Sequence, residues 1–388
     1  MVPKVSTKKI LDDKSAILAL DPCGSFKDVL AFSENLKLAI KNVKAFNLPE
    51  KVKVGRHLIR YANVDKVVFA GMGGSAMAGD VVKDWAESEA KVPMETVRSY
   101  HLPAYADNNT LVFLISYSGN TEETLSCMLD AVKKGCKMIS ISSDGTLRRV
   151  TQALGLPLVS IPKMAEARFS FPYLFTPLPY MLANLRILSL DKVEKEMSEA
   201  TDIVGKLQRE YAIETPLEEN FAKKAAFQIF GTVPIIYSYS QYRSASLRFK
   251  TQINENCKLP AVCDVFPELD HNEIMGWEAS KQIIKHYTLI LLRGPDEPRE
   301  VKSRIEVLKE KFFTKARSVI EINAQGQTAL ARIFSLFFTA DMISMYLAVL
   351  HRRDPVASKT FQLLKYEMTE RLGTLKKLEE EIQKLANV

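Results

Sequence analysis

The chain lacks the cysteine patterns that stabilise small secreted domains or bind zinc. Its 388 residues include five cysteines, an odd number, and no two of them form a Cys-x-x-Cys pair. Paired cysteines at short spacing are typical of zinc sites and redox motifs, and even sets are typical of disulfide frameworks. The start of the chain is also too polar for a secretory signal. We therefore expect reduced thiols and a cytoplasmic location.

Motifs for metals and nucleotides are also missing. No two of the five histidines have metal-ligand spacing, and no Gly-x-x-x-x-Gly-Lys-Ser/Thr loop occurs. Gly71 to Ala76 reads Gly-x-Gly-x-x-Ala after an apolar run, but the next predicted strand ends in Val97-Arg98-Ser99 rather than in an acid that could hold a ribose. We therefore expect no metal and no nucleotide cofactor.

Neither positive nor negative charge is concentrated in one part of the sequence. The net charge is +7, from 53 Lys and Arg against 46 Asp and Glu, and the two signs are interspersed. This pattern disfavours nucleic-acid binding, although a mild positive charge attracts anionic substrates. One long apolar stretch, residues 333–350, contains Asp341, which would be costly in a bilayer. We expect a buried helix there and no membrane span.

From residue 66 onward, short β-rich runs alternate with helical patterns. The predicted strands are 66–70, 94–97, 111–115, 138–142, 157–161, 233–237, 259–265, 287–292 and 318–322, and the main predicted helices are 25–44, 76–88, 122–134, 171–190, 191–211, 333–350 and 360–386. This alternation predicts an α/β protein with mainly parallel sheets covered on both faces. We expect two three-layer αβα sandwich domains, at 46–195 and 196–350, with helical segments at 1–45 and 351–388.

Two loops between a predicted strand and a predicted helix are rich in glycine and hydroxyl residues. They read Gly71-Met72-Gly73-Gly74-Ser75 and Ser116-Tyr117-Ser118-Gly119-Asn120-Thr121. Such turns present backbone N–H groups and hydroxyls at the positive end of a helix, where a phosphate dianion is stabilised without a metal. The expected phosphate-binding residues are Gly74, Ser75, Ser116, Ser118, Gly119 and Thr121.

Four motifs together resemble the sugar isomerase (SIS) superfamily. They are Gly73-Gly74-Ser75, Ser116-x-Ser118-Gly119-x-Thr121, Asn254-Glu255-Asn256 and Asp270-His271-Asn272. More narrowly, they resemble the archaeal and bacterial bifunctional phosphoglucose/phosphomannose isomerases over roughly residues 25–365. The resemblance implies two SIS domains, a sugar-phosphate substrate, no cofactor, and a homodimer with a shared active site.

Isomerisation between an aldose phosphate and a ketose phosphate needs a base that moves a proton between C1 and C2, help in opening the ring, and a cation beside the enediolate. The resemblance implies Glu255 as the base and Arg168 as the cation. It implies that His271, reaching the site from the partner subunit, and Lys365 open the ring, with Lys359 as the alternative lysine. Burial of Glu255 among its neighbours would raise its pKa.

One departure from the family pattern follows Arg168, where Phe169-Ser170-Phe171-Pro172 replaces the usual run of small residues. The function expected is a metal-independent interconversion of glucose 6-phosphate, and mannose 6-phosphate, with fructose 6-phosphate through a cis-enediolate. The alternative is a non-catalytic SIS regulator that binds a sugar phosphate. The presence of all four catalytic candidates and the absence of an attached helix-turn-helix domain favour the enzyme.

Overall fold

A computed structural model describes residues 8–386 of the chain, which divides into two compact units. The five-strand unit consists of Glu34–Lys195 and residues 358–386. The four-strand unit consists of residues 8–33 and Glu196–Ala357. Each unit is built on one parallel sheet, which agrees with the predicted α/β class.

The five-strand unit has the strand order β4-β3-β5-β6-β7, and every neighbouring pair is parallel. Its strands are β3 (Lys66–Ala70), β4 (Met94–Val97), β5 (Thr110–Ile115), β6 (Lys137–Ser142) and β7 (Leu158–Ser160), and a separate hairpin joins β1 (Lys51–Val54) to β2 (His57–Arg60). Its helices are α4 (Phe32–Lys44), α5 (Gly73–Ala86), α6 (Glu122–Lys134), α7 (Gly145–Ala153), η2 (Ala167–Ser170), α8 (Phe171–Phe175), α9 (Pro177–Asn184), α16 (Lys359–Leu372) and α17 (Thr374–Ala386).

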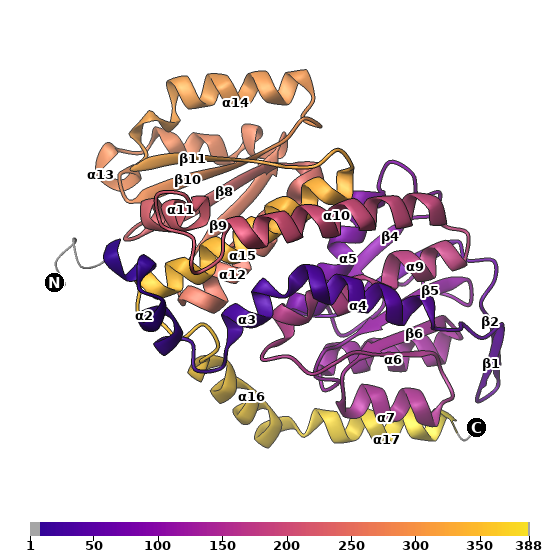
Figure 1. Cartoon of the computed structure of the whole chain (residues 1–388). Helices are drawn as coiled ribbons and strands as arrows, with labels where there is room; N and C mark the ends of the chain where they lie inside the picture. The colour runs from indigo at the N-terminus through magenta and orange to yellow at the C-terminus, as the bar shows by residue number, and fades with distance from the viewer. Residues whose placement is uncertain (1–7, 387–388) are drawn as a thin grey trace. The chain divides into compact units, whose positions relative to one another are not determined.

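Parallel strands require crossover helices, and right-handed crossovers place α5 on the face of the sheet opposite to α6 and α7. Helix α5 packs against α8 and α9, whereas α17 packs against α6 and, less extensively, α7. The C-terminal helix is therefore an outer layer over one face of this unit, as the yellow helix beside α7 shows in Figure 1.

The four-strand unit has the parallel order β11-β10-β8-β9. Its strands are β8 (Val233–Tyr239), β9 (Val262–Phe266), β10 (Tyr287–Arg293) and β11 (Ser318–Asn323). Its helices are η1 (Ile10–Asp12), α2 (Lys14–Ala19), α3 (Ser25–Leu30), α10 (Leu190–Glu210), α11 (Phe221–Ile229), η3 (Ser240–Tyr242), α12 (Arg243–Gln252), η4 (Ile253–Cys257), η5 (Glu268–His271), η6 (Glu273–Glu278), α13 (Lys281–Ile284), α14 (Arg299–Lys311), η7 (Phe313–Lys315) and α15 (Ala329–Leu350).

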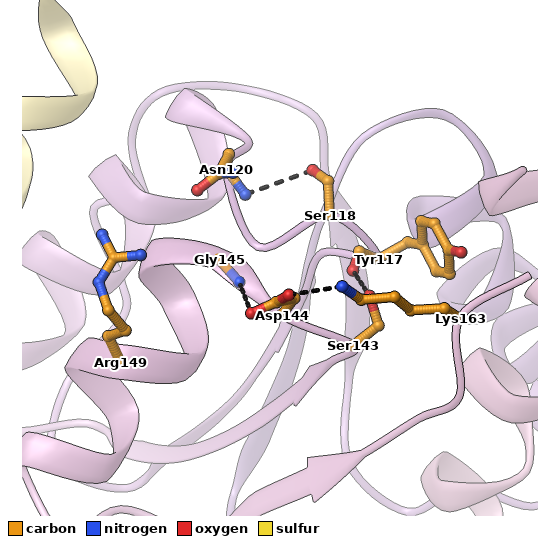
Figure 2. A pocket seen from close by; sticks show the side chains of 8 residues that line it. All are labelled: Tyr117, Ser118, Asn120, Ser143, Asp144, Gly145, Arg149 and Lys163. Atoms are coloured by element: carbon orange, nitrogen blue, oxygen red, sulfur yellow. Dashed lines mark hydrogen bonds and ion pairs between the residues drawn. The ribbon is translucent and has the colours of Figure 1, made fainter.

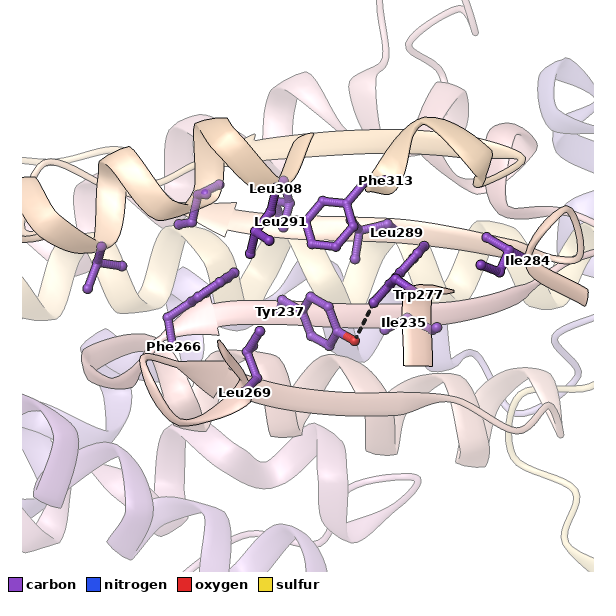
Figure 3. Close-up of a cluster of buried hydrophobic side chains, with 12 residues drawn as sticks. Ile235, Tyr237, Phe266, Leu269, Trp277, Ile284, Leu289, Leu291, Leu308 and Phe313 are labelled. Atoms are coloured by element: carbon purple, nitrogen blue, oxygen red, sulfur yellow. Dashed lines mark hydrogen bonds between the residues drawn. The ribbon is translucent and has the colours of Figure 1, made fainter. Parts of the chain in front are cut away.

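One face of the four-strand sheet carries an aromatic and aliphatic core, drawn in Figure 3. Tyr237, Leu289 and Leu291 project from the strands toward Leu308 of α14 and toward Trp277 and Phe313. The indole Nε1 of Trp277 donates to the Tyr237 hydroxyl at 3.0 Å, so its polar atom is satisfied inside the core. On the other side, α15 packs against both α11 and α12.

Helix α15 is the one described helix that is long and apolar enough to cross a membrane by length and composition. All of its most apolar window is buried within the chain. Asp341, near its middle, is 1% exposed and forms an ion pair with Arg248 of α12 at 2.8 Å. The stretch 333–350 is therefore a core helix here, as expected from its charged residue.

The strands form where the sequence predicts them, and the largest shift is at 259–265, where β9 begins at Val262. Three predictions of single helices were wrong. Residues 25–44 form α3 and α4, residues 171–190 form α8 and α9 with α10 beginning at Leu190, and residues 360–386 break into α16 and α17 at Gly373, whose φ is +57°. The predicted loop Gly73-Gly74-Ser75 is the first turn of α5.

The packing in Figure 3 predicts which substitutions destabilise the four-strand unit. The unfolding of each unit can be followed separately by fluorescence, because each contains one of the two tryptophans, Trp85 and Trp277. In a Trp85→Phe background, Leu291→Ala should lower the free energy of unfolding reported by Trp277 fluorescence by about 2–5 kcal/mol, because Leu291 is fully buried. Val319→Ala, at a position 40% exposed on β11, is the control and should change it by about 0.5 kcal/mol or less. Equal effects of the two substitutions would contradict this packing.

Candidate active site

Both hydroxyl-rich loops lie at the point where the strand order of the five-strand sheet reverses. From β3 the chain goes by way of α5 to the edge strand β4, and from β5 it goes by way of α6 to β6 on the other side. The crevice outside the carboxyl ends of the strands at such a switch point is the usual ligand site of open α/β sheets. The topology therefore brings the loops after β3 and β5 together.

A hydrogen bond joins these two loops. The backbone N–H of Tyr117 donates to Ser75 Oγ at 3.3 Å. Ser116 Oγ lies 2.8 Å from Thr121 Oγ1 and accepts from the Gly119 N–H at 3.1 Å. Ser75 and Ser116 are buried, whereas Ser118 and Thr121 are partly exposed. Ser116 thus shapes the loop from within, and the partly exposed hydroxyls of Ser118 and Thr121 are the ones open to a ligand.

A third loop, between β6 and α7, holds the second one in place. Gly119 has φ +70°, and a Cβ there would lie 1.7 Å from the carbonyl oxygen of Asp144. A Cβ on Gly145, where φ is +80°, would lie 2.3 Å from the carbonyl oxygen of Ser118. The Leu147 N–H also donates to the Gly119 carbonyl at 2.8 Å. Only glycine fits at the first two positions.

The loops after β5 and β6, together with Arg149 and Lys163, line an open pocket of about 430 Å³, shown in Figure 2, and the loop after β3 contributes no lining residue. Its lining residues are Tyr117, Ser118, Asn120, Ser143, Asp144, Gly145, Arg149 and Lys163. Apart from Ser118, none of these was a predicted site residue. The missed signal is Ser142-Ser143-Asp144-Gly145, a third strand-to-helix turn with a hydroxyl pair and a glycine.

Two cations at this pocket are held by carboxylates. Lys163 Nζ lies 2.8 Å from Asp144 and lowers the pKa of that carboxyl group. The Arg149 guanidinium donates to both carboxylate oxygens of Glu379 on α17, at 2.8 Å and 3.1 Å. The helix that covers α6 and α7 is therefore linked to the rim of the pocket.

Arg168 lies next to the first turn of α5. A Cβ on Gly74 would be 3.5 Å from the Arg168 Cα, so the two backbones are in van der Waals contact. The Arg168 side chain is buried, lies 3.6 Å from a carboxylate oxygen of Glu166, and stacks over the Phe169 ring at 4.9 Å from its centroid. The aromatic residue that departs from the family pattern thus packs against the arginine. The structure brings Arg168 together with the candidate phosphate-binding loops.

Glu255 lies in the four-strand unit on a single π-helical turn, Ile253–Cys257, that ends α12. Turns of this kind are rare and occur frequently at functional sites. Ile253, Asn256 and Cys257 are buried, whereas Glu255 is exposed. The burial considered from the sequence therefore does not occur in this chain, and the carboxylate is presented outward.

His271 and Glu255 do not lie at the same end of the four-strand sheet. Helix α12 runs back from the carboxyl end of β8, so Glu255 precedes the amino end of β9. His271 follows the carboxyl end of β9 and is exposed. Strand β9 has five residues, which span about 16 Å. Within one chain, the two candidates therefore lie beyond opposite ends of this strand.

Lys365 and Lys359 lie on α16, and both are exposed. Lys365 Nζ is 4.4 Å from the centre of the Phe361 ring. The same helix exposes Phe361, Leu363, Leu364 and Tyr366, each by more than half. A helix that exposes such large apolar side chains is unusual on the surface of a monomer. The same helix carries the candidate lysine.

No group of three or more His, Cys, Asp or Glu side chains suited to a metal ion occurs among residues 8–386. The candidate residues available for chemistry are therefore hydroxyls and backbone N–H groups for an anion, one buried arginine, one exposed carboxylate, one histidine and a lysine.

Comparison with known proteins gives matches in both units of the chain. A SIS-domain model matches residues 60–153, and a model for the bacterial phospho-glucose isomerase C-terminal SIS domain matches residues 218–368. A bifunctional phosphoglucose/phosphomannose isomerase from Caldicellulosiruptor bescii is 35% identical over 333 residues, which are 84% of this chain and 98% of that protein. The chain belongs to the bifunctional phosphoglucose/phosphomannose isomerase family.

Further similarities are consistent with this family. A second bifunctional phosphoglucose/phosphomannose isomerase, from Aquifex aeolicus, is 33% identical over 309 residues, 78% of this chain and 90% of that protein. A crystal structure of a hypothetical protein from Thermus thermophilus superposes with a TM-score of 0.69 at 19% identity, covering 92% of this chain and 94% of that one, which shows a shared fold. The resemblance found in the sequence is thus confirmed.

The interlocked glycines give a prediction for the phosphate-binding loops. Gly119→Ala should unfold or displace the 116–121 loop, because a Cβ cannot approach the Asp144 carbonyl oxygen. Gly155→Ala is the matched control, since φ there is also positive (+63°) but nothing lies within 4 Å, and we expect it to cost about 1 kcal/mol.

Both variants are compared by denaturation followed at Trp85, in a Trp277→Phe background, and by the affinity for inorganic phosphate. We expect Gly119→Ala to lose more stability than the control and to weaken phosphate binding at least tenfold. If the two variants behave alike, the close approach of the two loops is not needed for anion binding.

Proposed function

We propose that this protein is a metal-independent aldose–ketose isomerase that interconverts glucose 6-phosphate and mannose 6-phosphate with fructose 6-phosphate. The main support is the site in the five-strand unit, where two hydroxyl-rich loops meet at the switch point of a parallel sheet, in a chain whose relatives are named bifunctional phosphoglucose/phosphomannose isomerases. This role places the enzyme in carbohydrate metabolism, at the glycolytic and gluconeogenic step between these hexose phosphates, in the cytoplasm.

The phosphate is proposed to bind at the loops that contain Ser75, Ser116, Ser118 and Thr121. The partly exposed hydroxyls of Ser118 and Thr121 and the Gly74 N–H are the proposed donors, whereas Ser75, Ser116 and the Gly119 N–H are bonded within the loops and keep their shape. A helix N-terminus stabilises a dianion through its unpaired N–H groups and its dipole. The serine and threonine hydroxyls are further hydrogen-bond donors, and they bind the phosphate without any change in their protonation. Because these contacts are the same in substrate and transition state, they contribute to binding rather than to the chemical step.

For the chemical step, Glu255 removes the C2 proton of the aldose and returns it to C1. The intermediate is a cis-enediolate, and the Arg168 guanidinium stabilises its charge because it stays protonated and offers several donors. His271 and Lys365 assist ring opening by moving a proton between the ring oxygen and the anomeric hydroxyl. Mannose 6-phosphate differs only at C2, so it gives the same enediolate once the C2–C3 bond has rotated.

A homodimer with a shared active site is supported by two observations. Glu255 and His271 lie beyond opposite ends of β9 in one chain, so a partner subunit could supply the histidine that completes a site. Helix α16, which carries Lys365, exposes Phe361, Leu363, Leu364 and Tyr366, and a second subunit would bury them.

The activity is tested with purified, chelator-treated protein given glucose 6-phosphate and mannose 6-phosphate separately, and fructose 6-phosphate formation is followed. Production from both sugars is expected, with deuterium from D₂O incorporated at C1 or C2 if an enediolate forms. Glucosamine 6-phosphate serves as a comparison substrate. Binding of the sugar phosphates without turnover would instead favour the non-catalytic regulator.

Glu255→Gln should retain the fold and phosphate binding but lose turnover by about four orders of magnitude or more, since a general base has been removed. The control is Glu278→Gln, another exposed glutamate in the same unit with no proposed role, which should be as active as the parent. Activity of Glu255→Gln near that of the control would eliminate Glu255 as the base.

The shared site is tested with heterodimers purified through two different tags. A dimer of one Glu255→Gln chain and one His271→Ala chain should recover about half of the parent activity, because one of its two sites is then intact. A parent chain paired with a double-variant chain, Glu255→Gln with His271→Ala, should be nearly inactive because both sites then carry one defect. The reverse pattern would place Glu255 and His271 of one chain in the same site.

A further inference from the structure

A buried ion pair holds the helix that leads into the π-helical turn of Glu255. Asp341 of α15 accepts from Arg248 Nε at 2.8 Å and from an Arg248 terminal nitrogen at 2.9 Å, and both side chains are 2% exposed. Gln252, the last residue of α12, donates its amide to the same carboxylate at 2.8 Å. The carboxylate therefore fixes α12 at two positions one helical turn apart.

The π-helical turn itself is attached to α15 three residues further along. Asn256 donates its amide to Ser344 Oγ at 2.9 Å, and the Cys257 thiol donates to the Ser344 carbonyl oxygen at 3.1 Å. Ser344 Oγ in turn donates to the backbone carbonyl oxygen of Asp341 at 2.7 Å. The two attachments form one continuous network along α15, on the buried face of the turn that presents Glu255 on its other face.

A buried ion pair is a poor way to stabilise a fold. Desolvation of a carboxylate and a guanidinium offsets most of their attraction, and apolar residues of similar volume are often as stabilising in such places. The ion pair does fix how α12 and α15 are aligned along their lengths. In a helix each residue adds about 100° of rotation, so a shift of one residue between α12 and α15 would turn Glu255 away from its present direction.

We propose that Asp341 is a positioning residue for the isomerase reaction: through Arg248, Gln252 and the linked Ser344, it holds the π-helical turn in the register that directs Glu255 at the substrate. Asp341 itself is buried and does not touch the substrate. The proposal rests on the proposed function of Glu255.

The decisive variant replaces the pair by apolar side chains, Arg248→Met with Asp341→Leu. It leaves no unpaired buried charge, so the chain can fold even where Asp341→Asn alone does not, although the Gln252 amide loses its acceptor. Ser344→Ala removes the Asn256 bond of the second attachment at small cost in volume and leaves the Cys257 bond to the Ser344 backbone carbonyl oxygen. Thr339→Val is the control, because Thr339 is buried on the same helix but its hydroxyl donates to the Ser335 carbonyl oxygen and lies 3.4 Å from the Tyr211 hydroxyl, with no bond to α12.

We expect the double variant and Ser344→Ala to fold, to keep KM within about twofold, and to lose kcat by about 10- to 100-fold, as a misplaced catalytic group does. Thr339→Val should keep kcat. A purely structural pair predicts the opposite for the double variant, namely a changed stability with kcat within about twofold of the parent. That result would overturn the proposal.

A second readout needs no activity. The Cys257 thiol is buried in the π-helical turn, so its labelling by a thiol reagent, located by peptide mass spectrometry, reports how firmly the turn is held. Labelling should be faster in the double variant and in Ser344→Ala but not in Thr339→Val. Unchanged labelling would show that the pair does not hold the turn. A parent protein that turns over no sugar phosphate would overturn the proposed function, whereas the labelling result would still decide whether Asp341 fixes this segment.

Discussion

The approach of Gly119 to the Asp144 carbonyl oxygen constrains the candidate phosphate site more than any other contact. It forces glycine with positive φ at 119 and at 145, and it ties the loop after β5 to the loop after β6. The hydrogen bond from the Tyr117 N–H to Ser75 then ties the same loop to α5. Three strand-to-helix turns thus support one another, and the hydroxyls are fixed before any anion arrives. Preorganised donors of this kind lose little entropy on binding.

The fold was largely predictable because its signal is local. β-Rich runs of four to seven residues alternating with amphipathic helices define a parallel α/β protein wherever they occur. Two of the breaks in the helices were missed for a physical reason, since one residue in the left-handed region, Arg186 after α9 or Gly373 after α16, ends a helix without disturbing its polar and apolar pattern. The break at Ala31, where φ is −95°, has no such residue. The hairpin of β1 and β2 was missed although Val52, Val54, Leu58 and Ile59 flank Gly55.

The candidate site was predictable where its residues are consecutive. Ser116 to Thr121 can be found from a single stretch of sequence. The pocket lining contributed by Ser143, Arg149 and Lys163 cannot, because it forms only where separate segments of the chain meet. The placement of Arg168 against Gly74 likewise depends on packing between η2 and α5. The roles of Ser116 and Ser118 also differ in a way that spacing cannot show, because the first hydroxyl is turned into the loop and the second is partly exposed.

The two units differ in how they hold their candidate residues, and this difference follows from the chemistry proposed for each. A phosphate is a fixed group, and a rigid cradle of backbone and hydroxyl donors suits it throughout the reaction. A base must instead reach two carbon atoms in turn, C2 and then C1, on an open-chain sugar whose C2–C3 bond also rotates. An exposed carboxylate on a π-helical turn is anchored from behind through Asn256 and Asp341, so the backbone that carries it is held in one direction. Anchoring the backbone of the turn while the carboxylate faces outward is therefore a physical solution to proton transfer between neighbouring carbons.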